Sequence, residues 1–327
     1  MLCLICSLRE ADATGSHIIP HSVLESMYND GAKGRDMEQN FQLGGEGSAA
    51  YFGRRVLPEA VQQTIGRQLT DEEIEKEPNP YVADHIFCVA CEKKLSFFES
   101  LHKQKVASRL ATGKPLSPQQ VCIAHYFWLS VIYRCAVTNF NHFQLDMGQR
   151  AVLHGIVNAI LAESEADTER NCLARPVAEN LFIGYYKPGE NSGRNAVFLH
   201  LEKQNPYLLF INQYVLVFNY QLPQVPALET ELRVSLGIGA EGTTMKVFAD
   251  QERNLLLAYC WALAACYLVE EFKVNFARRY QQRHRRAPRL VVVEAFIFEL
   301  TTAKVLETVK YSTARIEQLT RKYLLAT

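Results

Sequence analysis

The chain has 327 residues, a length that favours about two domains of roughly 100–200 residues each. Hydrophobic residues make up 48% and charged residues 21%, which is typical of a globular protein and excludes a disordered or low-complexity chain. The 35 Lys and Arg residues balance the 35 Asp and Glu residues, so the whole chain lacks the basic excess of a histone-like or polybasic membrane protein. Any contact with nucleic acid must therefore come from a local patch.

The sequence has neither the pattern of a membrane span nor that of a secretory signal. Its longest apolar run, residues 255–269, is shorter than the stretch of about 18 residues that a span needs, and it predicts a buried helix. The first residues lack a basic leader and a cleavage site, so we expect a cytoplasmic protein with no membrane partner. In that compartment, the nine cysteines are expected to be free thiols or metal ligands.

Four of the nine cysteines form two C-x2-C pairs, whereas the others are scattered through apolar stretches. Two residues between thiolates allow a tight turn to place both sulfurs about 2.3 Å from one zinc ion, and two such turns complete a tetrahedral site. A closed four-thiolate site is structural, because it leaves no position for water. We therefore expect a structural zinc ion on Cys3, Cys6, Cys88 and Cys91, although 81 residues separate the pairs. The alternative is a set of unrelated buried thiols.

The segments that follow the two cysteine pairs carry a second pattern. Ser16-His17-Ile18-Ile19-Pro20 follows the first pair, and Glu92 directly follows the second. The order C-x2-C, S-H-I-I-P and C-x2-C-E resembles the zinc-stabilised HNH endonucleases of the ββα-metal class, over about residues 1–105. The resemblance implies hydrolysis of phosphodiester bonds, with DNA as the expected substrate and bacterial anti-phage defence as an expected setting.

The resemblance also implies roles for two residues. In the family, a histidine general base activates water while a divalent ion stabilises the phosphate, so we expect Mg²⁺ or Mn²⁺ beside the structural zinc. His17 matches the base, because an ordinary histidine pKa of about 6.5 lets the ring accept a proton at neutral pH. Glu92 replaces the family's final histidine, and its carboxylate is a hard oxygen ligand suited to Mg²⁺ or Mn²⁺.

The chain departs from the family pattern at two other positions. Ser16 stands where the family often has an Asp or His ligand, and a serine hydroxyl is a poor metal ligand. The family's middle asparagine lies a few residues before the second cysteine pair, where this chain has Asp84 and His85. We take Asp84 as a candidate metal ligand and His85 as a candidate catalytic residue, with Asn79 as a more distant alternative.

Two further residues are candidates for the same site. Glu99 lies seven residues after Glu92 and would share its helix face, the alternative being a solvated surface acid. His21 would share a face with His17 only if the chain became helical after Pro20.

We expect a first domain over residues 1–115, with an insertion at about 29–80. The glycine-rich run Gly44–Gly47 lacks the G-x-x-x-x-G-K-[ST] pattern of a phosphate loop and predicts a flexible loop. Residues 70–73 have the pattern of a capping box and predict a short acidic helix. The domain has 13 Lys or Arg against 16 Asp or Glu, a balance that disfavours DNA binding by this domain alone.

We expect a second domain over residues 116–327 that senses a signal or docks a partner. A capping box at Ser117 predicts a core helix over residues 121–140, and Arg134 on it is typical of a structural ion pair. A further helix over 148–162 and an acidic loop over 163–169 follow.

The remaining pattern alternates short apolar runs with turns. Four runs rich in β-branched and aromatic residues predict a meander of three or four strands, over residues 181–186, 196–201, 208–211 and 214–219. We then expect a helix over 251–279, a strand over 289–298 and an amphipathic helix over 302–325. The expected fold class is α+β, an HNH-like (ββα-metal) zinc-knuckle domain followed by a mixed helical and antiparallel-sheet domain.

Residues 272–289 contain seven basic residues and no Asp or Glu. One interpretation is a solvated helix end, where the helix dipole favours cations. The other is a nucleic-acid contact patch, for which the candidates are Arg283, Arg285 and Arg286.

The sequence therefore supports three functional hypotheses. The favoured one is a metal-dependent HNH-type endonuclease. The second is a zinc-stabilised module that binds nucleic acid or protein without catalysis, which Ser16 and the missing final histidine favour. The third is a structural subunit whose second domain mediates assembly with a partner protein or as a homo-oligomer.

Overall fold

The protein, here a computed structural model, divides into two compact units, and each is described by itself. Unit 1 comprises Met1–Asn29 and Tyr81–Cys260, and unit 2 comprises Asp30–Pro80 and Trp261–Thr327. Helices and strands are mixed, as expected for an α+β fold. The structure describes residues 1–24, 39–44, 47–53, 56, 59, 61–62, 70, 72, 79, 81–171, 181–186, 198–201, 207–211, 213–218, 245–304 and 310–325.

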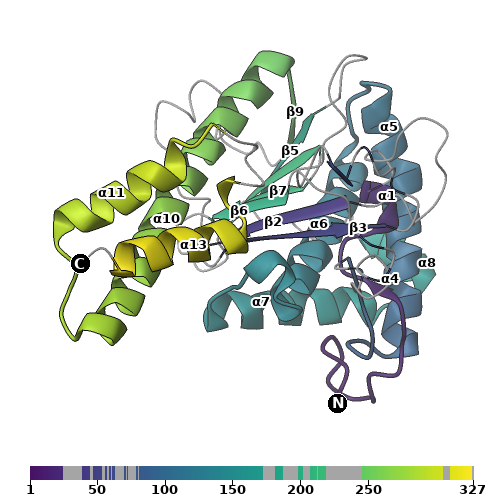
Figure 1. Cartoon of the computed structure of the whole chain (residues 1–327). Helices are drawn as coiled ribbons and strands as arrows, with labels where there is room; N and C mark the ends of the chain where they lie inside the picture. The colour runs from purple at the N-terminus through teal and green to yellow at the C-terminus, as the bar shows by residue number, and fades with distance from the viewer. Residues whose placement is uncertain are drawn as a thin grey trace. The chain divides into compact units, whose positions relative to one another are not determined.

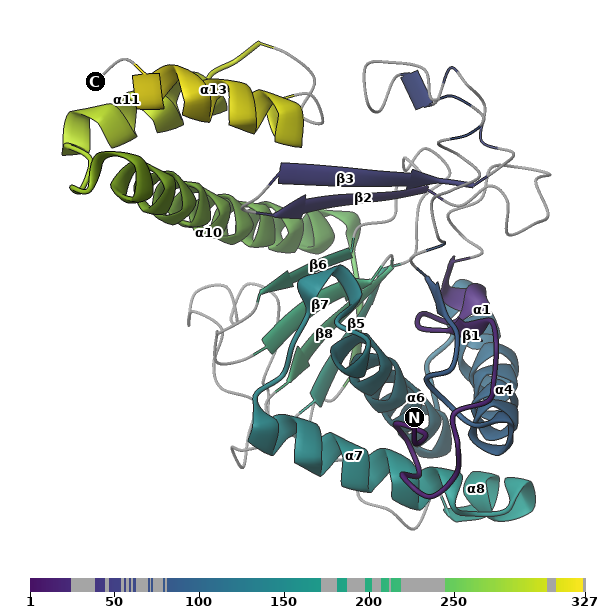
Figure 2. The same ribbon diagram turned by 60° about the horizontal axis from the view of Figure 1, so that its bottom comes forward.

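Unit 1 begins with two very short strands and the helices that follow them (Figure 2). Strand β1 (Ser16–His17) pairs antiparallel with β4 (Val82–Ala83). The one-turn helix α1 (His21–Leu24) follows β1, so the chain does become helical after Pro20, and α4 (Val89–His102) follows β4. Helix α4 continues into a π-helical turn, η3 (Lys103–Ala107), and this turn leads into the short helix α5 (Ser108–Ala111).

Helix α6 (Pro118–Val137) forms the centre of unit 1, as its apolar sequence predicts. The expected capping box is confirmed, because the Ser117 hydroxyl accepts from the Gln120 N–H and the Gln120 side chain accepts from the Ser117 N–H. Every residue from Cys122 to Ala136 is buried, so α6 is covered on all sides. The 3-10 turn η4 (Phe140–His142) and the second expected helix, α7 (Met147–Leu161), follow.

A five-stranded sheet covers one side of α6, and α4 packs on another (Figures 1 and 2). The order is β6-β7-β8-β5-β9, and the four expected strands are confirmed as a meander of β6, β7 and β8 with β5 antiparallel to β8. The fifth strand, β9, runs parallel to β5 and has no counterpart in the sequence analysis. The strands are β5 (Leu181–Tyr186), β6 (Phe198–Leu201), β7 (Tyr207–Ile211), β8 (Tyr214–Phe218) and β9 (Met245–Phe248).

Close packing between β5 and β9 depends on a glycine. A Cβ atom added to Gly184 would lie 2.1 Å from the Phe248 ring, far inside van der Waals contact. The Phe248 ring can therefore cover this part of β5 only because residue 184 has no side chain.

Two expectations in the helical parts of the chain are wrong. The acidic residues 163–169 do not form a loop, because α8 (Glu165–Asn171) begins where the Ser164 hydroxyl accepts a hydrogen bond from the Asp167 N–H. The expected strand over residues 289–298 is helix α11 (Leu290–Thr301). Its run of valine and phenylalanine has high strand propensity, but packing against neighbouring helices overrides that preference.

The insertion between the cysteine pairs contributes a hairpin to unit 2. Strand β2 (Gln39–Gly44) pairs antiparallel with β3 (Gly47–Phe52) in continuous register from Gln39–Phe52 to Gly44–Gly47. Gly44 ends β2 and Gly47 begins β3, so these two glycines are in strands, whereas the other two residues of the expected flexible loop, Gly45 and Glu46, lie outside the described residues. The helix expected over residues 70–73 falls mostly outside the described residues.

Three helices form the remaining core of unit 2. Helix α10 (Asp250–His284) extends the expected helix at its carboxyl end, but the described residues within 255–269 are exposed or half-buried, so the expectation of a buried helix there is wrong. Helix α13 (Thr313–Leu325) forms only the carboxyl-terminal part of the last expected helix, because residues 302–304 and 311–312 are not helical. Aromatic and aliphatic side chains from α10, α11 and α13 pack together, namely Phe272, Phe276, Tyr280, Phe296, Leu300, Ile316 and Leu319.

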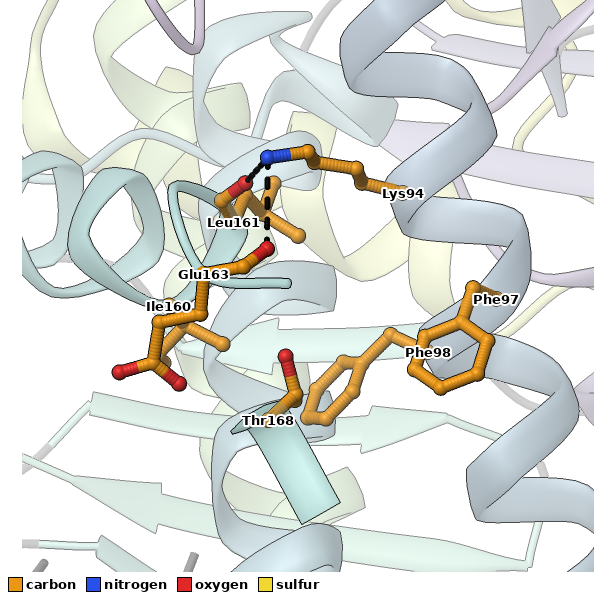
Figure 3. Close-up of a pocket in the computed structure, with 7 residues that line it drawn as sticks. All are labelled: Lys94, Phe97, Phe98, Ile160, Leu161, Glu163 and Thr168. Atoms are coloured by element: carbon orange, nitrogen blue, oxygen red, sulfur yellow. Dashed lines mark hydrogen bonds between the residues drawn. The ribbon is translucent and has the colours of Figure 1, made fainter. Parts of the chain in front are cut away.

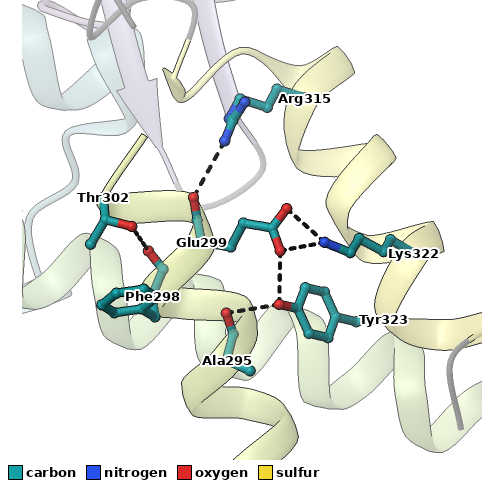
Figure 4. A network of polar contacts seen from close by, with 7 residues as sticks. All are labelled: Ala295, Phe298, Glu299, Thr302, Arg315, Lys322 and Tyr323. Atoms are coloured by element: carbon teal, nitrogen blue, oxygen red, sulfur yellow. Dashed lines mark hydrogen bonds and ion pairs between the residues drawn. The ribbon is translucent and has the colours of Figure 1, made fainter. Parts of the chain in front are cut away.

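A polar network also joins α11 to α13 (Figure 4). The Glu299 carboxylate accepts hydrogen bonds from the Lys322 ammonium at 2.6 and 2.8 Å and from the Tyr323 hydroxyl at 2.8 Å. The Arg315 guanidinium donates to the Glu299 main-chain oxygen at 3.3 Å. The network fixes the register of the two helices, while its exposed ion pair adds little free energy.

The domain boundary expected after residue 115 stays a prediction. Helix α4 precedes this position and α6 follows it, and Leu95 and Phe98 of α4 belong to the same hydrophobic core as Phe127 of α6. Within the described ranges, no helix is long and apolar enough to cross a membrane.

Candidate metal centre and adjoining polar cluster

The first cysteine pair lies in a tight turn at the start of the chain. The Cys3 N–H donates to the Arg9 oxygen at 2.8 Å, and the Ser7 N–H donates to the Cys3 oxygen at 2.9 Å. Ser7 has a φ of 53°, in the left-handed region, which lets the chain reverse directly after Cys6.

The second cysteine pair begins helix α4. Cys88 is the N-cap residue of the helix, and Cys91 lies in its first turn. The Leu4 N–H donates to the Ile86 oxygen at 3.0 Å, and the Asp12 carboxylate accepts from the Val89 N–H at 2.9 Å. These bonds hold the first turn of the chain against the start of α4.

The four cysteines form one cluster, as their spacing predicts. Their sulfur atoms all lie within 4.8 Å of one another, and the Cys6 and Cys88 sulfurs are 3.9 Å apart. A tetrahedral zinc site with bonds of about 2.3 Å requires sulfur–sulfur separations of about 3.8 Å, so the cluster fits such an ion. None of the four is in a disulfide. The cluster could therefore hold a metal ion such as zinc.

The thiols of the cluster differ in acidity. Burial raises the pKa of Cys3 and of Cys91 above the ordinary value. Burial acts on Cys6 in the same sense, but hydrogen bonds from main-chain groups of Leu8 and Arg9 outweigh it and lower the pKa of Cys6 to about 7. Cys6 therefore becomes a thiolate, the form that binds metal, more readily than Cys3 or Cys91.

A buried arginine connects β1 to α4 beside the cluster. The side chain of Arg134, on α6, is only 1% exposed. One guanidinium nitrogen, NH1, donates to the Glu99 carboxylate at 2.6 Å and to the main-chain oxygen of His17 at 2.9 Å. Glu99 is thus ion-paired rather than a solvated surface acid, and the expected structural ion pair of Arg134 is confirmed.

Glu92 faces the same arginine from the first turn of α4. Burial raises the pKa of Glu92, and the nearby Glu99 carboxylate raises it further. The Arg134 guanidinium and the Ser16 hydroxyl lower the pKa of Glu92, but the net result is a pKa above the ordinary value. The Oε2 atom of Glu92, the hydroxyl of Ser16 and the NH2 nitrogen of Arg134 are buried and have no hydrogen-bond partner. Buried polar atoms without a partner are typical of places that receive a polar ligand or water.

The structure brings the other candidate residues together only in part. The rings of His17 and His21 lie edge to face, with centroids 6.3 Å apart. Asp84 and His85 are exposed in the turn before α4, and the Asp84 carboxylate accepts a hydrogen bond from the Gly15 N–H at 2.6 Å. Asn79 belongs to unit 2. Among the described residues, the four cysteines are the one group of three or more such side chains that could share a metal ion.

A small cavity lies elsewhere in unit 1, against α4, α7 and α8 (Figure 3). Its volume of about 10 Å³ has room for about one water molecule. The Lys94 ammonium at its edge donates to the main-chain oxygens of Leu161 and Glu163, the last turn of α7. This contact caps a helix end, so the cavity is not a substrate site.

The three candidate nucleic-acid residues lie together in unit 2, at the turn between α10 and α11. Arg283, Arg285 and Arg286 are exposed. Within the described part of the chain, none of their guanidinium groups forms a hydrogen bond or an ion pair. The neighbouring Arg289 is exposed as well. The turn therefore presents positive charge that is not neutralised by acids.

The chain matches no protein-family model, no curated protein sequence and no solved structure. Its function must therefore be inferred from the residues themselves and from their geometry.

One link in the site could not be read from the sequence. The bond from Arg134 to the main-chain oxygen of His17 joins residues 117 positions apart. The sequence showed only that Arg134 is a charged residue among apolar neighbours. This pattern indicates an ion pair but not the additional hydrogen bond to the main chain of His17.

Proposed function

We propose that this protein is a metal-dependent HNH-type endonuclease that hydrolyses phosphodiester bonds, with DNA as its substrate. The observation that carries the proposal is the position of β1 and α4 beside the four-cysteine cluster. His17 ends β1, Glu92 directly follows Cys91, and both contact or face Arg134. In this reading, zinc on the four cysteines is structural and holds the start of α4 against the first turn of the chain.

His17 is the proposed general base. Its neutral ring would accept the proton of the water that attacks the phosphorus atom. Glu92 would hold a catalytic Mg²⁺ or Mn²⁺ ion, with Asp84 as the second candidate ligand and His85 as a further catalytic candidate. When bound, that ion would supply positive charge to the phosphate and to the departing 3′ oxygen.

The charges beside Glu92 support a cation at this position. Glu92 and Glu99 together carry two negative charges when ionised, while Arg134 supplies one positive charge. The unpartnered Oε2 atom of Glu92 is a hard oxygen donor, the kind that Mg²⁺ and Mn²⁺ prefer.

The arginines at the turn between α10 and α11 are the proposed contact for the polyanion. Residues 1–115 have an acidic balance, so affinity for DNA must come largely from elsewhere in the chain. The unpaired Arg283, Arg285 and Arg286 can each neutralise a phosphate. We also propose a cytoplasmic location and a role in anti-phage defence, in which unit 2 responds to a signal, a partner protein or a second copy of the chain.

A cleavage assay on supercoiled plasmid tests the proposal. Protein whose zinc content has been measured is incubated with Mg²⁺, with Mn²⁺, or with EDTA at a concentration that leaves this zinc in place. Nicked or linear plasmid is expected with the added ions and not with EDTA. If neither DNA nor RNA is cleaved under any of these conditions, the proposed endonuclease activity is contradicted.

One observation favours a second candidate, a zinc-stabilised binding module without catalysis. Among the described residues, Glu92 does not join two other His, Cys, Asp or Glu side chains in a metal-binding group, and Ser16 is a poor ligand. Binding of DNA without cleavage in the same assay would support this candidate.

A further inference from the structure

Arg134 is a charged side chain in the most buried part of unit 1. Its neighbours on α6, from Val131 to Ala136, are all buried, and the guanidinium itself is 1% exposed. Burying a charge costs several kcal/mol unless the group is paired and hydrogen-bonded, and an apolar residue of similar volume is often at least as stabilising. A role in stability alone therefore explains Arg134 poorly.

Arg134 links α4, β1 and its own helix α6 through three hydrogen bonds. The Nη1 atom of Arg134 donates to both the Glu99 carboxylate and the His17 main-chain oxygen, and its Nε atom donates to the Ser130 oxygen within α6 at 3.3 Å. The same nitrogen of Arg134 donates to Glu99 and to the His17 oxygen. Glu99 therefore fixes the position from which the guanidinium makes its hydrogen bond to His17.

Strand β1 is very short, and directly after it the Ile18 N–H donates to the Tyr81 oxygen at 2.9 Å. The strand consists of two residues, whose partners on β4 are Ala83 and Val82. A ladder of two residue pairs is marginal on its own, so a buried hydrogen bond to its last residue has a large influence on where that residue lies. The hydrogen bond from Arg134 is made to the main-chain oxygen of His17 and does not involve the ring. It therefore fixes the position of the backbone from which the His17 side chain extends.

We infer that Arg134, oriented by Glu99, is a positioning residue for His17. The inference rests on the proposed function, because it assigns the pair a task in the reaction of that site. The pair holds the base where it meets the attacking water, whereas substrate affinity arises elsewhere, from contacts to phosphates. Loss of the pair should therefore lower kcat and leave KM unchanged, because a displaced base affects the chemical step alone.

Two conservative variants test the inference by steady-state cleavage of a short labelled duplex. Arg134→Lys keeps the charge but has a shorter reach and no planar fork, and Glu99→Gln keeps an acceptor oxygen but loses the ion pair. Each is expected to reduce kcat by about 10–100-fold at unchanged KM, since displacements of about 1 Å have effects of this size. The double variant should have a kcat little lower than that of either single variant, because both substitutions disrupt the same Arg134–Glu99 pair.

Arg170→Lys is the matched control, since Arg170 pairs with Asp167 on the exposed surface of α8. It should leave kcat, zinc content and thermal unfolding unchanged. The inference is overturned if Arg134→Lys and Glu99→Gln, with zinc and unfolding intact, cleave at the parent rate, or if their losses appear in KM. A parent chain that cleaves nothing overturns the proposed function instead, and the inference with it. If Arg134→Lys fails to fold, Glu99→Gln decides, because it leaves the guanidinium in place.

Discussion

The Tyr133 hydroxyl donates a hydrogen bond of 2.5 Å to the main-chain oxygen of Leu4, which lies between Cys3 and Cys6. The central helix of unit 1 therefore contacts the turn that carries Cys3 and Cys6 directly. His154 of α7 makes a similar contact, with its Nε2 atom 2.7 Å from the Ile5 oxygen. A change in the cysteine cluster should consequently be felt in the hydrophobic core around α6, which makes the cluster a stability element for the whole unit.

We predict about one zinc ion per chain and a cooperative loss of unit 1 when the site is broken. Cys88→Ser removes one ligand, and the binding free energy of a structural zinc ion is also folding free energy. Elemental analysis of freshly purified protein and thermal unfolding check both statements. Cys266→Ser is the control, since this exposed cysteine lies outside the cluster. Protein that contains no metal, or a Cys88→Ser variant as stable as the parent, would contradict the assignment.

For the proposed base, His17→Ala should reduce the cleavage rate by about 10²–10⁴-fold, the usual contribution of a general base. Zinc content and the midpoint of thermal unfolding should change little, because the Arg134 bond is made to the main chain of residue 17. His21→Ala is the comparison, as its ring lies beside His17 at 6.3 Å but has no proposed role in the proton transfer. Equal rates for His17→Ala and the parent would favour the binding module.

The arginine patch predicts a change in the salt dependence of DNA binding. Reversal of Arg283, Arg285 and Arg286 to Glu should reduce the slope of log K against log salt by about 0.9 for each lost phosphate contact and weaken cleavage. Binding isotherms at several salt concentrations measure the slope. A triple reversal of exposed arginines elsewhere, Arg150, Arg170 and Arg321, matches the change in net charge. If both triple variants bind like the parent at every salt concentration, the patch is only a solvated helix end.

The buried His102 predicts acid sensitivity of unit 1. Its ring stacks on Phe127 with centroids 3.7 Å apart, and burial lowers the pKa of His102 to about 3. The unfolded state therefore binds a proton more readily than the folded state, so stability is fully present above pH ~6.5 and falls as the pH drops towards 3. The free energy of unfolding should decrease by up to about 1.4 kcal/mol per pH unit from this residue.

Denaturant unfolding between pH 7.5 and 5 measures this dependence. His102→Phe keeps the stacked ring and removes the titrating group, and its free energy of unfolding should depend less steeply on pH by about one proton. Zinc content is monitored at each pH, because protonation of thiolates would also destabilise the protein. Identical pH slopes for the variant and the parent would show that His102 is not responsible.

Two glycine substitutions should have opposite effects. Gly184→Ala places a Cβ atom 2.1 Å from the Phe248 ring and should destabilise the sheet by about 1–3 kcal/mol, the usual cost of overpacking. Gly155→Ala lies on an α7 position with no atom within 4 Å and should stabilise the protein by about 0.5–1 kcal/mol. Denaturant unfolding of both variants distinguishes the effects, and equal changes would contradict the packing of β9 on β5.

Local patterns in the sequence predicted much of unit 1. The capping box at Ser117 placed α6, alternating turns and apolar runs placed four strands, and the C-x2-C spacing grouped the four cysteines. Each of these signals acts over a few residues, or is fixed by the geometry of one metal ion. For this reason they could be read without knowledge of the tertiary structure.

Another error and two omissions have a different cause, which is long-range packing. The residues of α11 have strand propensity, and only their contact with Phe276 and other side chains of unit 2 makes them helical. Strand β9 is recruited by β5, more than 60 residues earlier in the chain, and Arg134 contacts His17, which lies 117 positions earlier. No local window of the sequence contains these partners.

The separation of 81 residues between the cysteine pairs also has a consequence for synthesis of the chain. At a translation rate of about 5–20 residues per second, Cys3 and Cys6 are made roughly 4–16 s before Cys88 is added. During this interval the nascent chain carries two neighbouring thiols without the other half of their site. An oxidant that joins these two thiols would remove both ligands, and the chain would then be completed without a metal site. For the zinc protein proposed here, correct folding of each new molecule would thus depend on the reducing capacity of the compartment while the ribosome is still adding the insertion.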